Sequence, residues 1–248
     1  MESLRPLARL SADVRAMLAP YGAKATWPAG FTIYQRGAGA DGLFVVLAGR
    51  VVLRSRVKAG RGFVPAVAVA GETFGAEGLV PRGAYATDAR AEEASETLHV
   101  RGPQLRTFLR EQPLYGQALL GQVMAERTEL LDKLREVATL SVEDRLIAAM
   151  LRLAAQRPRG TAPGDALVLG PNEYRLLCEL VGATRESVSL VFNRFAAGGL
   201  VDRDGTTYTV TDMGALADRL GSTWAEADAP LVVEREPGVA GVGRAVRA

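Results

Sequence analysis

The residues best suited to chemistry lie on one face of a helix predicted near the end of the chain, opposite an apolar stripe. The residues of this face are Thr184, Arg185, Glu186, Ser189, Leu190, Asn193 and Arg194. Arginine can pair with guanine through two hydrogen bonds, glutamate can accept from cytosine, and serine and asparagine can bond to bases or phosphates. The spacing therefore predicts a surface that contacts base edges and phosphates of double-stranded DNA.

A helix-turn-helix is predicted to position this face. The first helix has an apolar face formed by Leu176, Leu177, Leu180 and Val181. Gly182 can adopt the positive φ of a sharp turn, and Thr184 is a suitable N-cap for the second helix. The second helix buries a stripe formed by Val188, Val191, Phe192 and Phe195. Residues 199–210 then predict a β-hairpin wing, which favours DNA binding over a helical pair used only for packing.

The first part of the chain is predicted to be a small antiparallel β-roll or sandwich. Between residues 27 and 100, short apolar runs alternate with glycine-bearing turns. These runs are Phe31–Tyr34, Leu43–Leu47, Val51–Val57, Phe63–Val69 and Thr97–Val100. Gly49 lies between two of them and predicts a tight hairpin. A helix over Leu10–Tyr21, capped by Ser11 or Asp13, is expected before the roll.

A long helix is predicted over residues 113–140. A seven-residue phase places one mostly apolar seam along it, formed by Leu120, Val123, Arg127, Leu130, Leu134 and Val137. Such a seam normally packs against another helix, which favours a homodimer over the alternative that the helix lies only on its own sheet domain. A further helix, Val142–Gln156, is expected after a cap at Ser141, and Leu167–Leu169 is expected to form a short strand.

Composition excludes several classes of function. The single cysteine, Cys178, excludes an intramolecular disulfide, a cysteine zinc site and an iron–sulfur cluster held by one chain, and the single histidine, His99, excludes a site with two imidazoles. Glu72 and Glu77 are expected near one turn but lack a nucleophile, a metal set or a histidine partner, so no enzyme, metal site or cofactor is predicted. The lack of a signal peptide and of a long apolar run predicts a cytoplasmic protein without a membrane partner.

The charge balance of the predicted DNA-binding part is unusual. Residues 138–221 contain nine arginines against ten aspartates and glutamates, a net charge of −1. Non-specific affinity depends on neutralising phosphates, so weak non-specific binding is expected. The arginines that are candidates for phosphate contacts are Arg145, Arg152, Arg175, Arg185, Arg194 and Arg203.

The chain from about Leu10 to Leu220 resembles the cyclic-AMP receptor protein / fumarate-nitrate regulator (Crp/Fnr) family of bacterial transcription factors. The resemblance is carried by LVGATRESVSLVFNRFAAGGLV, by the hairpin-like GLFVVLAGRVVL and by GETFGAEGL. It implies an α+β fold with a cyclic-nucleotide-binding-like β-roll, a dimerisation helix and a winged helix-turn-helix. The expected bounds are 1–112, 113–140 and 141–221, followed by a mobile tail over 222–248.

Several positions depart from the family pattern. In members that bind cyclic AMP, a glutamate after the second glycine contacts the ribose, an Arg-Ser pair holds the phosphate, and a polar pair on the long helix touches adenine. The corresponding residues in this chain are Gly75, Ala76, Glu77, Tyr85, Ala86, Thr87, Leu130 and Leu131. A cyclic phosphate buried without a cation is disfavoured, so this pocket is predicted not to bind cyclic AMP.

Other effectors of the family are equally poorly supported. His99 has no partner cysteine, so a structural role is favoured over haem ligation, and Cys178 is expected to be packed. Leu190 stands where the family often has a second arginine and cannot bond to guanine, so the family's half-site cannot be assumed.

The leading hypothesis is a homodimeric, sequence-specific transcription regulator, an activator that works without cyclic AMP. Its expected partners are a near-palindromic DNA site and, by the resemblance, RNA polymerase. One alternative is a regulator whose roll binds an unidentified small molecule. Another is an interaction protein with a degenerate winged domain.

Overall fold

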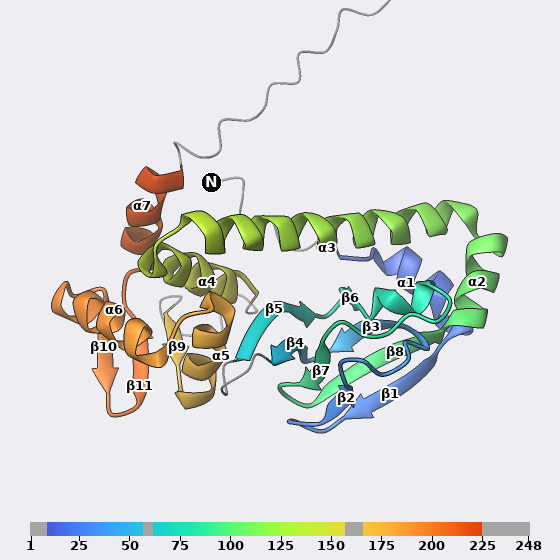
Figure 1. Ribbon diagram of the computed structural model, residues 1–248, viewed down its shortest axis with the longest axis horizontal. Helices are drawn as coiled ribbons and strands as arrows, with labels where there is room; N and C mark the ends of the chain where they lie inside the picture. The colour runs from blue at the N-terminus through green and yellow to red at the C-terminus, as the bar shows by residue number, and fades with distance from the viewer. Residues whose placement is uncertain (1–8, 57–61, 157–165, 225–248) are drawn as a thin grey trace, which may run out of the picture.

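The computed structural model describes residues 9–56, 62–156 and 166–224 of the 248-residue chain. It confirms the predicted architecture: an N-terminal β-roll, a long helix and a C-terminal winged unit (Figure 1). The long helix runs along one side of the roll and ends at the winged unit. None of the described helices is long and apolar enough to cross a membrane.

The roll consists of two four-stranded antiparallel sheets. The first sheet has the order β1 (Ala23–Trp27), β8 (Ser95–Arg101), β3 (Gly42–Ala48) and β6 (Thr73–Phe74). The second has the order β2 (Thr32–Tyr34), β7 (Asp88–Ala91), β4 (Arg50–Arg56) and β5 (Gly62–Val69). Aromatic and aliphatic side chains from both sheets fill the space between them; the buried members of this cluster are Tyr34, Phe44, Val46, Val51, Ala68, Phe74, Tyr85 and Ala89.

The hairpin predicted at Gly49 is wrong. β3 pairs with β6 and β8, whereas β4 pairs with β5 and β7, so the chain crosses from one sheet to the other at Gly49. The positive φ of 81° is present, and a Cβ atom there would lie 2.5 Å from the Ala94 carbonyl oxygen, so the crossing requires glycine. Two apolar runs flanking a glycine show that both strands are buried, but they do not show which strands pair.

The N-terminal helix is shorter than predicted. α1 (Ala12–Leu18) starts with Ser11 as its N-cap, whose hydroxyl accepts from the Val14 N–H, and a 3-10 turn follows over Ala19–Tyr21. Pro20 has no N–H to continue the α-helical hydrogen bonds, which explains the change. The helix packs on the outside of the first sheet together with α2 (Gly102–Glu111).

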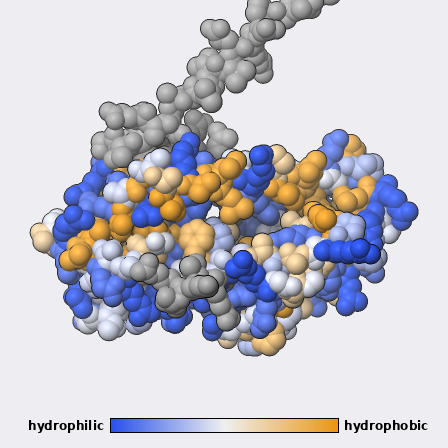
Figure 2. Space-filling view, in the orientation of Figure 1, coloured by the Kyte–Doolittle hydropathy of each residue, from blue (hydrophilic) through white to orange (hydrophobic). Residues whose placement is uncertain are grey.

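The long helix, α3 (Pro113–Thr139), has two different faces. One face turns toward the rest of the chain and buries Leu119, Gln122, Lys133 and Glu136. The other leaves the predicted seam in solvent: Leu120 is 62 % and Leu134 is 65 % exposed, and Leu130 and Val137 are also exposed. Figure 2 shows hydrophobic residues gathered along the edge where α3 runs. Contact with the chain's own roll therefore leaves the seam free to meet a second helix.

The winged unit packs helices around a three-stranded sheet of order β10-β11-β9. Its elements are α4 (Val142–Gln156), β9 (Leu167–Leu169), α5 (Pro171–Val181), α6 (Arg185–Ala197), β10 (Val201–Asp204), β11 (Thr207–Val210) and α7 (Met213–Trp224). Ser141 caps α4 as predicted, because its hydroxyl accepts from the Asp144 N–H at 3.1 Å. α7 runs three residues beyond Gly221, so the tail does not begin at residue 222; residues 225–248 lie outside the described part of the chain.

Candidate nucleic-acid interface

The predicted helix-turn-helix is confirmed between α5 and α6. α5 ends at Gly182, which has a φ of 65°. The side-chain oxygen of Thr184 accepts from the Ser187 N–H at 3.2 Å and so caps α6. The apolar stripe of α6 is buried as predicted and consists of Val188, Val191, Phe192 and Phe195.

The opposite face of α6 is open to solvent. The exposed residues among those singled out for DNA contact are Arg185, Glu186, Leu190, Asn193 and Arg194. Thr184 and Ser189 are half-buried. Leu190 is 66 % exposed at the middle of this face. Its apolar side chain forms no hydrogen bonds with water, but it could contact a thymine methyl group. The fold thus presents all seven predicted residues on or beside one accessible surface.

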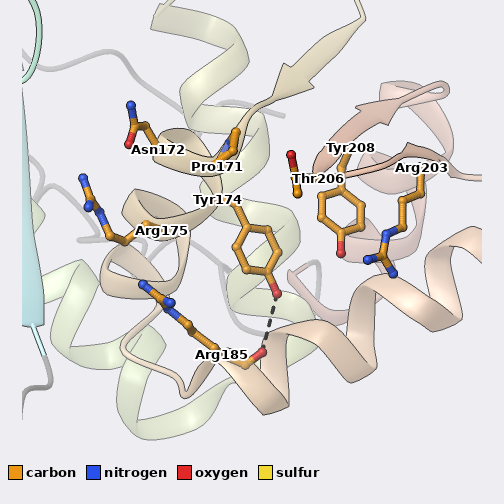
Figure 3. Close-up of a pocket in the computed structure, with 8 residues that line it drawn as sticks. All are labelled: Pro171, Asn172, Tyr174, Arg175, Arg185, Arg203, Thr206 and Tyr208. Carbon is orange, nitrogen blue, oxygen red and sulfur yellow. Dashed lines mark hydrogen bonds between the residues drawn. The ribbon is translucent and has the colours of Figure 1, made fainter.

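An open hollow of about 400 Å³ lies beside the start of α6 (Figure 3). We call it the arginine hollow, since three arginines from three elements are among its lining residues: Arg175 from α5, Arg185 from α6 and Arg203 from β10. The rest of the lining is Pro171, Asn172, Tyr174, Thr206 and Tyr208. Three cations around one open hollow favour an anionic occupant such as a phosphate.

Stacked aromatic rings hold the hollow in shape. Tyr174 and Tyr208 stack with ring centroids 5.3 Å apart, and the guanidinium carbon of Arg203 lies 5.5 Å from the Tyr208 centroid. The Tyr174 hydroxyl donates to the backbone carbonyl of Arg185 at 3.5 Å. Burial raises the pKa of Tyr174 to about 12, so the hydroxyl stays protonated and can donate. These contacts tie the wing, α5 and the first residue of α6 together.

Arg194 is less free than the sequence suggested. Its Nη2 lies 3.0 Å from a carboxylate oxygen of Glu143 in α4, and the other oxygen of that carboxylate lies 2.9 Å from Nε of Arg219. Arg194 is the most C-terminal residue of the predicted DNA face. Since it already has an anionic partner, we expect its attraction for a phosphate to be weaker than that of Arg175 or Arg203.

The residues predicted for an effector pocket are only partly brought together. The turn from Gly75, with a φ of 77°, to Glu77 lies against residues 85–87, and a Glu77 carboxylate oxygen accepts from the Ala86 N–H at 3.0 Å. The Tyr85 ring stacks on Tyr34 at 3.6 Å, and its hydroxyl donates to Asp41. Ala76 and Thr87 are half-buried beside them. Side chains of the protein itself thus occupy this part of the roll.

Leu130 and Leu131 are the members of the predicted pocket that lie on α3. Both are about half exposed on α3. At the contact between α3 and the roll the structure instead has Glu126, which accepts from the Thr73 hydroxyl. Sequence reasoning missed this residue, although its spacing of four from the buried Gln122 could have indicated it.

We refer to Glu72, Glu77, Glu126 and Glu129 as the roll carboxylates. Burial raises the pKa of Glu72 to about 7, and burial together with the charges of Glu72 and Glu126 raises that of Glu129 to about 8. Burial also raises the pKa of Glu126, with a contribution from Glu77. Arg9 is the cation beside Glu72, at 3.7 Å. Glu129 is therefore mostly protonated near pH 7, and the raised pKa values indicate that this region disfavours additional negative charge.

The single histidine and the single cysteine are both packed against other side chains of the fold. His99 lies inside β8 rather than at its end and stacks on Phe44, with Nε2 3.3 Å from Asp41; burial lowers its pKa. Cys178 is buried in α5, and burial raises its pKa to about 11. Among the described residues, no group of three or more histidine, cysteine or acidic side chains is placed to hold a metal ion.

Known proteins resemble both halves of this chain. Residues 24–112 match the model of the cyclic nucleotide-binding domain, and residues 144–219 match that of the Crp-like helix-turn-helix domain. The CRP-like cAMP-activated global transcriptional regulator of Mycobacterium tuberculosis is 26 % identical over 195 residues, which are 78 % of this chain and 86 % of that protein. The cAMP-activated global transcriptional regulator CRP of Escherichia coli is 25 % identical over 186 residues, 74 % of this chain and 87 % of that protein.

Solved structures share the fold. The c-di-GMP responsive global regulator CLP of Xanthomonas campestris has a TM-score of 0.70 at 20 % identity. The superposition covers 82 % of this chain and 100 % of that one. A CRP/FNR-family transcriptional regulator of Thermus thermophilus has a TM-score of 0.64 at 22 % identity, covering 80 % of this chain and 98 % of that one. At these identities the likeness is one of fold.

Proposed function

The chain belongs to the Crp/Fnr family of transcriptional regulators, and on that premise we propose that it is a homodimeric, sequence-specific activator that binds a near-palindromic DNA site without cyclic AMP. Its partners would be promoter DNA and RNA polymerase, and its place of action the cytoplasm. The family is one of DNA-binding regulators and not of enzymes.

The arginine hollow is the observation that carries this proposal. In a helix-turn-helix protein the second helix lies in the major groove, and its first residues reach the base edges. Arg185 stands at that position, while Arg175 and Arg203 flank it from α5 and the wing. Figure 3 shows Arg175 and Arg203 on opposite sides of the tyrosine pair, so a DNA strand passing along α6 and the wing would offer each of them a different backbone phosphate. Because residues 138–221 contain ten acidic residues against nine arginines, the placement of individual arginines matters more than the net charge.

Dimerisation would use the exposed seam of α3. The seam runs over several helical turns of a 27-residue helix, and its leucines gain free energy only when a second apolar surface covers them. Two copies related by a two-fold axis would present two α6 helices to half-sites about 34–36 Å apart. The DNA site should therefore be a near-palindrome.

Independence from cyclic AMP is supported by what fills the roll. Glu77 already accepts the backbone N–H of Ala86, which lies in the segment where the resemblance puts the phosphate-binding pair. Glu77 and Glu126 both contribute to raising the pKa of the neighbouring Tyr34, after burial. A cyclic phosphate entering this region would meet carboxylates and would have to displace an internal hydrogen bond. Its charge would be buried without compensation.

Selection of bound fragments from random double-stranded DNA by the full chain tests the proposal. We expect enrichment of one near-palindromic sequence in the absence of any nucleotide. Recovery of no preferred sequence would contradict DNA recognition and favour an interaction protein with a degenerate winged domain. A promoter reporter carrying the selected site would then test activation, for which increased transcription is expected and unchanged or reduced transcription counts against an activator.

A further inference from the structure

The second sheet of the roll is apolar on both faces. Val51 and Ala68 point into the roll, but their neighbours along the strands point outward and are buried as well. These outward residues are Val52, Val64, Val67 and Val69. Antiparallel sheets commonly keep one face solvated, so this outer face needs a cover. Leu176 of α5, only 1 % exposed, provides it together with the half-buried Leu180.

Charged groups reinforce the same contact. Arg54 of β4 is largely buried between two carboxylates: its Nε lies 3.1 Å from Glu179 of α5, and its Nη2 lies 3.4 Å from Glu92 of the roll. Gly62 of β5 approaches the same glutamate so closely that a Cβ atom there would be 3.1 Å from the Glu179 carboxyl carbon. We call this contact the α5 latch: Arg54 and the four outward valines on the roll, and Leu176 and Glu179 on α5.

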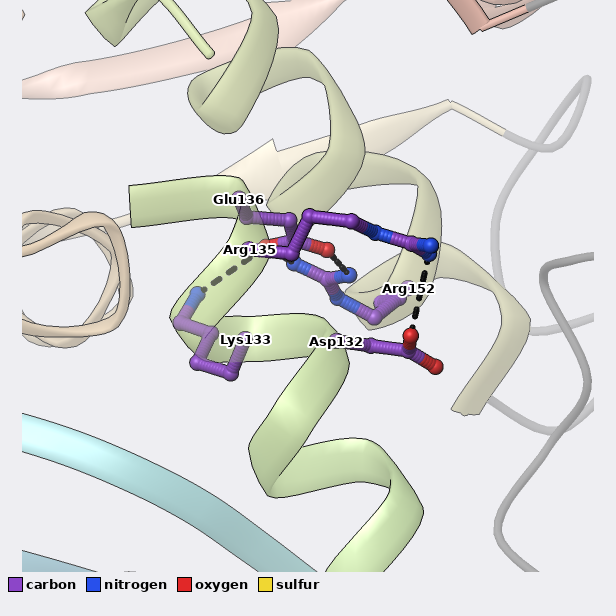
Figure 4. Close-up of polar contacts among 5 residues, drawn as sticks. All are labelled: Asp132, Lys133, Arg135, Glu136 and Arg152. Carbon is purple, nitrogen blue, oxygen red and sulfur yellow. Dashed lines mark hydrogen bonds and ion pairs between the residues drawn. The ribbon is translucent and has the colours of Figure 1, made fainter. Parts of the chain in front are cut away.

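A second set of contacts joins the winged unit to α3 (Figure 4). Arg152 of α4 contacts both carboxylate oxygens of Glu136, with Nη2 2.9 Å from one of them, and Lys133 lies 3.4 Å from the same carboxylate. Burial alone would raise the pKa of Glu136, but Arg152 and Lys133 lower it, so the carboxylate stays charged and paired. The winged unit is thereby held at two separate places.

The latched arrangement leaves the DNA-binding surface uncovered. The roll contacts α5 through Leu176 and Glu179, whereas Arg185 and Asn193 on α6 are exposed and the arginine hollow is open. The latch therefore orients the helix-turn-helix without masking it.

We propose that the α5 latch takes the place of an effector: the chain's own roll holds the winged unit in the DNA-binding orientation. This inference rests on the proposed function and concerns its regulation. Opening the latch would leave the winged unit held to the rest of the chain through α3 and the Glu136–Arg152 contact alone. Its orientation to the roll would then vary, and only the fraction of molecules that is latched would fit both half-sites. Apparent DNA affinity falls in proportion to that fraction.

Breaking the latch from the roll side leaves every residue of the winged unit unchanged. Val67→Glu places a charge between the sheet and Leu176, and Arg54→Met removes the ion pair with Glu179. If the latched fraction drops to about one tenth, affinity for the DNA selected by the wild-type chain falls about tenfold. Arg101→Met, at an exposed arginine of the same roll, is the matched control and should bind like the wild type. Unchanged affinity in both latch variants, with circular dichroism showing folded protein, would overturn the inference.

A disulfide across the latch gives the opposite test. In a Cys178→Ala background, Gly62→Cys and Glu179→Cys bring two thiols together, since a Cβ at residue 62 would be 3.3 Å from Cγ of Glu179. We expect the oxidised protein to bind the selected DNA at least as tightly as the reduced protein, and oxidation to restore affinity when Val67→Glu is added. Loss of binding on oxidation would show that the latched state is inactive and would overturn the inference. DNA binding by the reduced protein keeps that failure distinct from failure of the proposed function.

Discussion

The interior of the roll and the arginine hollow of the winged unit differ in what they offer an anion. In the roll, Glu77 accepts the Ala86 N–H, Tyr34 and Tyr85 stack beside it, and the raised pKa values of Glu72 and Glu129 indicate that further negative charge is disfavoured there. In the hollow, three arginines line about 400 Å³ of open space. The roll thus contains a carboxyl group of the chain itself, whereas the hollow is lined by arginines and is open to an external anion.

Under the proposed function, this difference separates the two halves of the chain. The DNA-binding half presents arginines around an open surface, whereas in the effector half a Glu77 oxygen takes the Ala86 N–H in the segment where the resemblance puts the phosphate-binding pair. Both halves fold because the apolar residues that define their cores are in place. An intact hydrophobic core therefore determines the fold of a domain but does not determine which ligand the domain binds.

The largest effect is expected from breaking the dimer, because the hollow must act twice to read a near-palindrome. Leu130→Glu together with Leu134→Glu should place four like charges in the seam and cost about 3–5 kcal/mol of dimer stability. Light scattering should show monomers, with strongly reduced DNA affinity. Leu114→Glu, at a 78 % exposed position of α3 outside the seam, is the control. A double variant that remains dimeric would refute the seam.

The next largest effect is expected from Arg185, the arginine of the hollow that is proposed to contact a base edge. Arg185→Ala should cost about 1–3 kcal/mol per half-site and relax the preference at one base pair, since arginine pairs bidentately with guanine. Binding to the selected site and to single-mismatch sites measures both quantities. Equal weakening on every sequence would make Arg185 a phosphate contact only.

The roll carboxylates predict a pH dependence of stability. The pKa of Glu72 is about 7 in the folded chain, above its ordinary value, so the folded state holds a proton that the unfolded state releases. Stability should therefore fall as pH rises from about 4.5 through 7, by about 3 kcal/mol from this residue. Glu72→Gln should reduce that loss in urea unfolding at pH 5.5 and 8.5, whereas Glu93→Gln, at an exposed site, should not. An unchanged pH slope in Glu72→Gln would contradict the assignment.

The smallest effects are expected from the flanking arginines. Arg175→Ala and Arg203→Ala should each weaken binding to all sequences and lower the salt slope by about one unit per half-site. Arg194→Ala should lower it less, because Glu143 already pairs with that arginine. Arg110→Ala, on α2 far from the winged unit, should leave the slope unchanged (Figure 1). A base-specific loss in Arg175→Ala or Arg203→Ala would assign that residue a reading role.

Much of this arrangement could be predicted from local sequence. The caps at Ser11, Ser141 and Thr184 and the turn at Gly182 depend on neighbouring residues only, and the structure confirms them. The pairing of β3 and β4 could not be predicted, because apolar runs do not specify their partners.

The contacts that sequence reasoning missed join residues far apart in the chain. Glu126 meets Thr73, and Arg54 meets Glu179, which no local pattern reveals. The run from Phe63 to Val69 did carry a signal, since an antiparallel strand that is apolar on both faces must be covered on both.

The most direct test of the account is the affinity of the full chain for its selected DNA with and without cyclic AMP. We predict a dissociation constant that changes by less than about twofold at saturating nucleotide, against the about 5–150-fold coupling typical of an allosteric effector. DNA binding that appears only after cyclic AMP is added would contradict the account, because the roll would then accept a phosphate where Glu77 bonds to the Ala86 N–H.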